Sequence, residues 1–239
     1  MEIISKNLTN RYSIINNLKP SNNIGIELGV AEGYYSTKMM ESNKFKLFYG
    51  VDSYEIFPHN DKEFYKTKSK LSKYKNYTLI RKRFEDARLL FKDNFFDFIY
   101  IDGFAETGHD NGTILYEWFP KLKIGGIFAG DDYHYDWPKI KKSVDYFMKQ
   151  SEHKLYITDV EDDNVYSQYP SWVTIKKNNK RIFFNKLKNN NQINHKITNR
   201  KHYFIKYYKS KLYYFLKGIF GKKIFYIAIK IYHKVFKIQ

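Results

Sequence analysis

The sequence predicts an α/β protein with a doubly wound, mostly parallel sheet of seven strands, helices on both of its faces, and a basic helical tail. Three observations support this prediction. Short apolar runs alternate with segments of helical composition, which is typical of parallel sheets. Four of these runs end in or beside an acidic residue. All 25 acidic residues lie at or before Asp163, so the last 76 residues differ in composition.

The elements follow from apolar runs bounded by glycine, proline and polar residues. Trp137-Pro138 suits a helix start, and the Gly125-Gly126 pair is expected to form a turn that ends the preceding helix. The expected strands are 24–28, 47–51, 77–80, 95–101, 127–129, 155–158 and 172–175. The expected helices are 8–18, 34–40, 61–74, 85–91, 113–122 and 138–150. Ligands of such sheets bind at the carboxyl ends of the strands, where the four acids are expected.

The first strand leads into a glycine turn, and residues 24–33 read IGIELGVAEG. A dinucleotide site would require G-x-G-x-x-G, whereas here Glu27 precedes Gly29 and Gly33 follows four residues later. No P-loop lysine follows. An acid beside the turn repels phosphate and attracts a cationic ligand. The second strand ends at Asp52, where doubly wound folds bind a nucleoside ribose.

Two later segments complete an ordered set of motifs. Residues 97–103 read DFIYIDG, and residues 118–133 read WFPKLKIGGIFAGDDY. With the glycine turn, they resemble the class I S-adenosylmethionine (SAM) methyltransferases, and most closely the small bacterial enzymes and the sugar O-methyltransferases of the macrocin type. The resemblance covers about residues 20–150. It implies a Rossmann-like fold, SAM as cofactor, and methyl transfer to a hydroxyl group of a sugar, for example on a surface-glycan precursor.

The resemblance also implies roles for particular residues. SAM would be bound by Glu27, Gly29, Gly33, Asp52, Phe84, Glu85 and Asp102. In metal-dependent relatives of this type, acids at the positions of Asp102, Asp131 and Asp132 hold Mg²⁺, which prefers carboxylate oxygens and water. A metal-bound hydroxyl loses its proton more easily. The alternatives are that Asp131 caps a turn, that Asp132 is solvated, and that Glu85 stabilises a helix N-terminus.

Candidate general bases follow the expected strand ends. His109 and His134 lie in loops on the same side of the sheet as the acids, and histidine titrates near neutral pH. Asp102 would lie between cofactor and acceptor. The alternative for each histidine is an ordinary surface position.

The chain divides into a domain at 1–184, an Asn- and Lys-rich linker at 185–199, and a tail at 200–239. Residues 1–163 have a net charge of −1 and residues 164–239 have +18. In 222–238, isoleucines recur at helical spacing and lysines lie on another face. Such helices bind anionic membrane surfaces. The alternatives are packing on the domain or a partner, and nucleic-acid binding, which the continuous apolar face makes less favourable.

Several function classes are disfavoured. The chain has no cysteine, which excludes disulfides, thiolate metal sites and the nucleophile of cytosine-5 methyltransferases. No Asn-Pro-Pro-Tyr motif of amino methyltransferases occurs. Without a signal peptide or a long apolar run, we expect a cytoplasmic enzyme, peripheral on the membrane. The alternatives are a nucleic-acid methyltransferase anchored by its tail and a non-catalytic membrane-docking protein.

Overall fold

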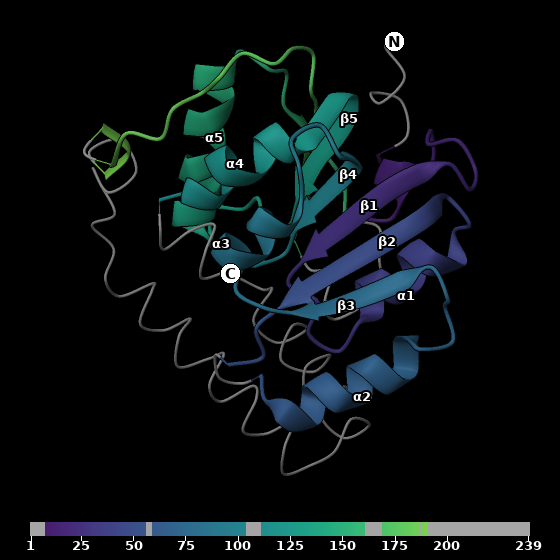
Figure 1. The fold of residues 1–239 in the computed structure, drawn as a ribbon. Helices are drawn as coiled ribbons and strands as arrows, with labels where there is room; N and C mark the ends of the chain where they lie inside the picture. Colours follow the sequence, from purple (N-terminus) through teal and green to yellow (C-terminus); the bar gives the residue numbers. More distant parts are fainter. Residues whose placement is uncertain (1–7, 56–58, 104–110, 161–168, 187, 191–239) are drawn as a thin grey trace, which may run out of the picture. The chain divides into compact units, whose positions relative to one another are not determined.

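The computed structural model describes residues 8–55, 59–103, 111–160, 169–186 and 188–190 (Figure 1). His109 and the tail at 200–239 lie outside the described residues, so the predictions made for them remain predictions. The same holds for most of the linker.

Seven strands form one sheet in the order β3-β2-β1-β4-β5-β7-β6. They are β1 (Asn23–Leu28), β2 (Phe45–Asp52), β3 (Tyr77–Arg81), β4 (Phe96–Ile101), β5 (Leu122–Gly130), β6 (Tyr156–Ile157) and β7 (Trp172–Ile175). The first five strands pair in parallel, and β7 is antiparallel to both β5 and β6. The predicted doubly wound, mostly parallel sheet of seven strands is therefore confirmed.

Helices cover both faces of the sheet (Figure 1). On one face, α3 (Phe84–Ala87), α4 (Thr113–Trp118) and α5 (Pro138–Ser151) share an apolar core with the sheet. On the other face, the 3₁₀ turn η2 (Ser13–Ile15) and α1 (Tyr34–Glu41) pack against β2, β4 and β5. Helix α2 (Asp61–Leu71) lies beside the start of α1, since Thr67 and Leu71 are the nearest side chains to Gly33. Short 3₁₀ turns, η3 (Arg88–Leu90) and η5 (Phe119–Lys121), extend α3 and α4.

The core is rich in aromatic side chains, and successive residues of the buried strands contribute them to opposite faces of the sheet. Phe96 of β4 packs with α4 on one face, while Phe98 and Tyr100 belong to the cluster on the other. Trp118 and Trp172 are fully buried. Burial of each such side chain stabilises the fold by about 1.5–3 kcal/mol, so these rings fix the sheet that positions the loops beyond its carboxyl ends.

Two predicted elements differ from the structure. The helix expected at 8–18 is only the turn η2, because the Asn10 side chain accepts hydrogen bonds from the backbone N–H groups of Tyr12 and Ser13 and closes a local turn there. The Gly125-Gly126 pair lies within β5 and does not end a helix. The pairing of β5 with β4 shifts at this pair, from Phe96↔Leu122 to Phe98↔Ile127. Such a shift of register is typical of a β-bulge.

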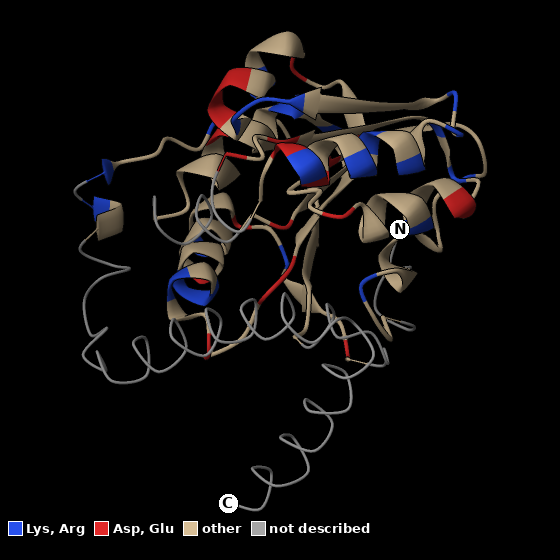
Figure 2. Ribbon diagram, turned by 90° about the horizontal axis from the view of Figure 1, so that it is seen from below, with Lys and Arg blue, Asp and Glu red and all other residues tan. Residues whose placement is uncertain are grey.

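Lysines and arginines are distributed over the helices and loops of the described chain (Figure 2), and Lys62, Lys66 and Lys68 of α2 are exposed. Within the described ranges, no helix is long and apolar enough to cross a membrane. The first described residues of the expected linker contact the domain: Asn189 is buried, and its side-chain NH₂ donates to the hydroxyl of Tyr116, 3.2 Å away.

Candidate active site

The turn after β1 requires glycine at its first position. Gly29 has a φ of +99°, and a Cβ atom there would lie 2.3 Å from the backbone oxygen of Asp102. Gly33 begins α1 with a φ of +71°. The strand end of β4 therefore packs directly against this turn, which places Asp102 beside the expected cofactor site.

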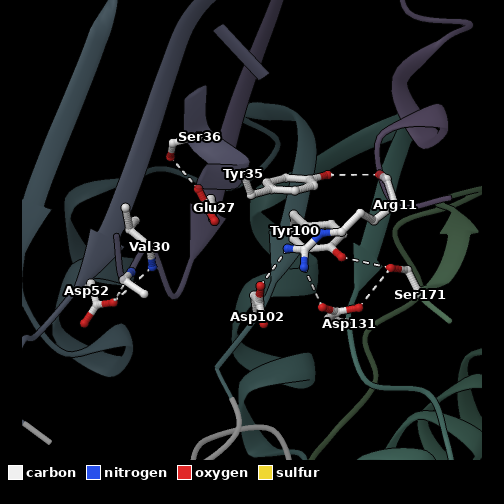
Figure 3. Close-up of polar contacts among 11 residues, drawn as sticks. Arg11, Glu27, Val30, Tyr35, Ser36, Asp52, Tyr100, Asp102, Asp131 and Ser171 are labelled. Atoms are coloured by element: carbon white, nitrogen blue, oxygen red, sulfur yellow. Dashed lines mark hydrogen bonds and ion pairs between the residues drawn. The ribbon is translucent and has the colours of Figure 1, made fainter. Parts of the chain in front are cut away.

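Asp52 organises the turn through backbone hydrogen bonds (Figure 3). Its Oδ2 accepts from the N–H groups of Val30 and Ala31, at 3.0 and 2.9 Å, and its Oδ1 accepts from the N–H of Tyr54 at 3.0 Å. A carboxylate oxygen has two lone pairs, so Oδ2 is fully used by these contacts and Oδ1 keeps capacity for one further hydrogen bond. Asp52 thus shapes the turn, and its contact with a ribose stays a prediction.

Glu27 is buried in β1 and accepts a hydrogen bond from the hydroxyl of Ser36 in α1 (Figure 3). Ser36 also hydrogen-bonds the hydroxyl of Tyr77, at 2.9 Å. Burial raises the pKa of Glu27 well above its ordinary value, and the charges of Asp102 and Asp52 raise it further. The hydrogen bond from Ser36 opposes this shift. A cationic ligand would relieve the repulsion among these three acids, so the site fits SAM with its sulfonium and amino groups.

A second polar cluster lies at the ends of β4 and β5 (Figure 3). Arg11 joins two carboxylates: its Nη2 donates to Oδ2 of Asp102 and its Nη1 donates to Oδ2 of Asp131, each at 2.7 Å. We call these three residues the acid–arginine cluster. Ser171 of the segment before β7 donates to Oδ1 of Asp131 at 3.1 Å and hydrogen-bonds the hydroxyl of Tyr100 at 2.9 Å.

The two acids of this cluster differ in access. The side chain of Asp131 is 6% exposed and that of Asp102 is 30% exposed. Burial raises the pKa of Asp102 to about 7, with Arg11 lowering it and Asp131 raising it. Asp102 is therefore a carboxylate that can exchange a proton near neutral pH and that a ligand can reach, while Asp131 anchors the arginine.

Arg11 was missed by the sequence reasoning. The guanidinium lies 4.6 Å from the ring centroid of Tyr35 and 5.2 Å from that of Tyr100, and the residue is 4% exposed. One signal could have found it: the first 80 residues contain 11 lysines and this one arginine. Arginine in place of lysine is typical of sites that need a planar, bidentate donor.

The described residues do not fit the predicted Mg²⁺ site. Within the part of the chain that the structure describes, no group of three or more His, Cys, Asp or Glu side chains could hold a metal ion. The guanidinium of Arg11 lies between Asp102 and Asp131, where the ion would have to lie. Asp132 adopts a left-handed backbone conformation next to Asp131, with a φ of +59°, and is partly buried. The position of Arg11 between Asp102 and Asp131 does not support a metal ion there, and the assignment of Asp102, Asp131 and Asp132 as metal ligands stays a prediction.

The remaining predicted site residues lie outside these contacts. Phe84 is the first residue of α3 and is buried in the core, and Glu85 is exposed with Arg83 3.8 Å away. Their contacts with an adenine ring stay predictions. The side chain of His134 is 42% exposed, and its Nδ1 accepts from the N–H of Asp136 at 3.1 Å. Its role as a base, like that of His109, is untested.

Comparisons with known proteins agree with this geometry. A family model described as a methyltransferase domain matches residues 26–133, which include Glu27, Asp52, Asp102 and Asp131. A search of curated protein sequences found no match.

Solved structures share the fold. A Streptococcus mutans protein assigned as a methyltransferase and crystallised with SAH aligns at 17% identity with a TM-score of 0.53, covering 69% of this chain and 94% of that one. An assigned caffeoyl-CoA O-methyltransferase from Staphylococcus aureus aligns at 16% identity and 0.52, covering 69% and 80%. An assigned rRNA methylase from Clostridium thermocellum aligns at 16% identity and 0.50, covering 69% and 94%. At these identities the likeness concerns the fold.

Proposed function

We propose that this chain is a class I SAM-dependent methyltransferase and that it methylates a hydroxyl group of a sugar. A methyltransferase-domain model matches residues 26–133, and solved structures of assigned methyltransferases share the fold. The observation that carries the proposal is the position of Asp102. Its backbone packs on the glycine turn. Its partly exposed carboxylate belongs to the acid–arginine cluster, where it pairs with Arg11. A proton acceptor therefore lies between the cofactor turn and the space beyond β4 and β5.

The chemistry of a hydroxyl acceptor explains why such a group is needed. SAM supplies an electrophilic methyl group on a positively charged sulfur. An alcohol is a weak nucleophile until its proton is removed, so a base within hydrogen-bond reach accelerates the transfer. In the proposed reaction the acceptor oxygen forms a bond to the methyl carbon, the sulfur–methyl bond breaks, and the hydroxyl proton moves to Asp102. Because burial raises the pKa of Asp102 to about 7, this carboxylate is basic enough to take the proton at neutral pH.

The other residues position the reactants. Glu27 and Asp52 place negative charge and a fixed glycine turn where a cationic cofactor would bind. Holding two reactants in line converts a bimolecular reaction into an effectively unimolecular one. The O-methyltransferase assignment of the Staphylococcus aureus structure supports an oxygen acceptor, and the sugar rests on the resemblance of the motifs to macrocin-type enzymes.

The basic tail supports an acceptor at a membrane surface. Residues 164–239 have a net charge of +18, and each Lys or Arg near an anionic surface contributes about 1 kcal/mol to binding. We therefore propose that the enzyme acts at the cytoplasmic face of a membrane, on a surface-glycan precursor assembled there.

The function is tested by two measurements on the full chain. Calorimetry should show micromolar binding of SAM, about −8 kcal/mol, and no comparable binding of NAD. Mass spectrometry of reactions with a panel of sugars and nucleotide sugars should then detect a gain of one methyl group. Methylation of RNA and of no sugar would instead support the nucleic-acid alternative.

The membrane association is tested by sedimentation with vesicles. A chain ending at residue 190 keeps Asn189 and its contact with Tyr116 and should bind SAM as the full chain does. The full chain should bind phosphatidylglycerol vesicles, and the shortened chain should not. Phosphatidylcholine vesicles and raised salt are the controls, since screening weakens attraction between exposed charges. Equal binding of both chains would remove the tail from this proposal.

A further inference from the structure

The acid–arginine cluster contains two of the three acids for which the resemblance implies a divalent ion. One guanidinium donates through two different nitrogens to two different carboxylates, both at 2.7 Å. A metal ion between the same carboxylates would perform the same bridging. Arg11 therefore satisfies the oxygens that an ion would need and adds a positive charge between them.

Several contacts keep this arginine in place. Its guanidinium lies beside the rings of Tyr35 and Tyr100, and the hydroxyl of Tyr35 donates to the backbone oxygen of Arg11 at 3.5 Å. The adjacent η2 turn inserts Ile14 and Ile15, at 1% and 3% exposure, into the core. Unlike a bound ion, this cation cannot exchange with solvent.

The cation also stays charged. Burial alone would lower the pKa of Arg11, but the nearby Asp131, Tyr100 and Asp102 raise it well above its ordinary value. Asp131, which is almost fully buried, receives a second hydrogen bond from Ser171. Asp131, itself hydrogen-bonded by Ser171, thus holds Nη1 of Arg11, and Nη2 donates to the more exposed Asp102.

We propose that Arg11 is the resident cation of the acceptor site and a positioning residue for methyl transfer, so that Asp102 and Asp131 bind no divalent metal. Arg11 fixes the Asp102 carboxylate and favours its charged, basic form. The role of Asp102 as base rests on the proposed function. The replacement of a metal by Arg11 does not, because it can be measured without an acceptor.

The test is binding of Mn²⁺ to the chelated full-length protein, followed by electron paramagnetic resonance. The variants are Arg11→Ala, Asp131→Asn, the double variant Arg11→Ala with Asp131→Asn, and Arg88→Ala as matched control. Arg88 pairs with Glu117 at 3.4 Å, away from the cluster. We expect Arg11→Ala to bind Mn²⁺ at least about tenfold more tightly than wild type, since two buried carboxylates then lack their cation. The double variant and Arg88→Ala should show no gain.

Two outcomes would overturn the proposal. The first is Mn²⁺ binding by the wild type that Asp131→Asn abolishes, which would mean that the acids hold a metal with Arg11 present. The second is an Arg11→Ala protein that folds, binds SAM and gains no Mn²⁺ affinity. If Arg11→Ala does not fold, the wild-type and Asp131→Asn measurements still decide the first point.

A second variant then addresses the positioning role. Arg11→Lys keeps the charge but replaces the two-nitrogen fork with a single ammonium. It should gain no Mn²⁺ affinity, while the pKa of Asp102, followed by carboxyl NMR, should differ from the wild-type value. An unchanged pKa of Asp102 in both Arg11→Lys and Arg11→Ala would contradict the positioning role. Failure of all acceptor assays, with these binding results as expected, would overturn the proposed function alone.

Discussion

The two halves of the site hold their carboxylates in different ways. On the cofactor side, Asp52 accepts from three backbone N–H groups and Glu27 accepts from Ser36, all within a short stretch of chain. On the acceptor side, Asp102 and Asp131 are held by Arg11, which lies 91 and 120 residues away in the sequence. The first half relies on neutral local donors, and the second relies on one remote charge.

The two halves should therefore differ in how much stability they lose when a partner of their carboxylates is removed by substitution. A carboxylate that accepts backbone hydrogen bonds loses part of its support when one donor is removed. Asp102 and Asp131 share one cation and lose their only charged partner when it is removed. For the buried Asp131, an uncompensated charge is far more costly than a lost neutral hydrogen bond. Four predictions test this contrast, beginning with the largest effect.

Asp102→Asn should lower the rate of methyl transfer by about 10²–10⁴-fold, because an amide cannot accept the acceptor's proton. In the wild type, the rate should rise with pH and level off above an apparent pKa of about 7, since only the charged carboxylate is a base. A pH–rate profile checks this. If His134→Ala removes the limb near pH 7 and Asp102→Asn does not, the base is His134.

Arg11→Ala should lower the free energy of unfolding by about 3–5 kcal/mol, because Asp131 is left as a buried charge without its cation and the partly exposed Asp102 loses the same partner. Urea denaturation at neutral pH measures the change. The matched control is Arg88→Ala, whose pair with Glu117 is about one third exposed and should contribute at most about 1 kcal/mol. Equal losses of unfolding free energy in the two variants would mean that Arg11 stabilises the fold no more than an ordinary surface ion pair does.

Asp52→Asn should weaken SAM binding by about 1–3 kcal/mol, or roughly five- to 150-fold. The amide oxygen can still accept from the turn, but the NH₂ group replaces the oxygen that accepts from the N–H of Tyr54 in the wild type. Calorimetry with SAM checks this result. Asp93→Asn, an exposed acid paired with Lys121, should leave the affinity unchanged, and a similar loss there would point to a general charge effect.

Ser36→Ala should cost about 1 kcal/mol of folding stability, the smallest of the four effects, because it removes one neutral donor from Glu27. The pKa of Glu27, already raised by burial, should rise further, since the Ser36 hydrogen bond lowers it. Urea denaturation and carboxyl NMR measure both changes. A loss as large as that of Arg11→Ala would remove the contrast between the two halves.

The same contrast explains what could be predicted from the sequence. The strands, the glycine turn and the acids at strand ends were predicted, because each depends on a short pattern such as an apolar run followed by Gly29 or Asp52. The bulge at Gly125-Gly126 was predicted as a turn, since a glycine pair looks the same in both, and only the pairing of β5 with β4 and β7 distinguishes them. Arg11 belongs to no local pattern, so its partners depend on the packing of η2 against the sheet.

Arg11 also has a consequence for synthesis of the chain on the ribosome. Asp131 follows it by 120 residues, so at about 5–20 residues per second Arg11 emerges roughly 6 to 24 s before its buried partner. The segment around η2 cannot complete its contacts during that interval. We therefore expect the acceptor side to fold later than the cofactor side. Until β5 has been synthesised, Arg11 should remain hydrated or bound by another protein.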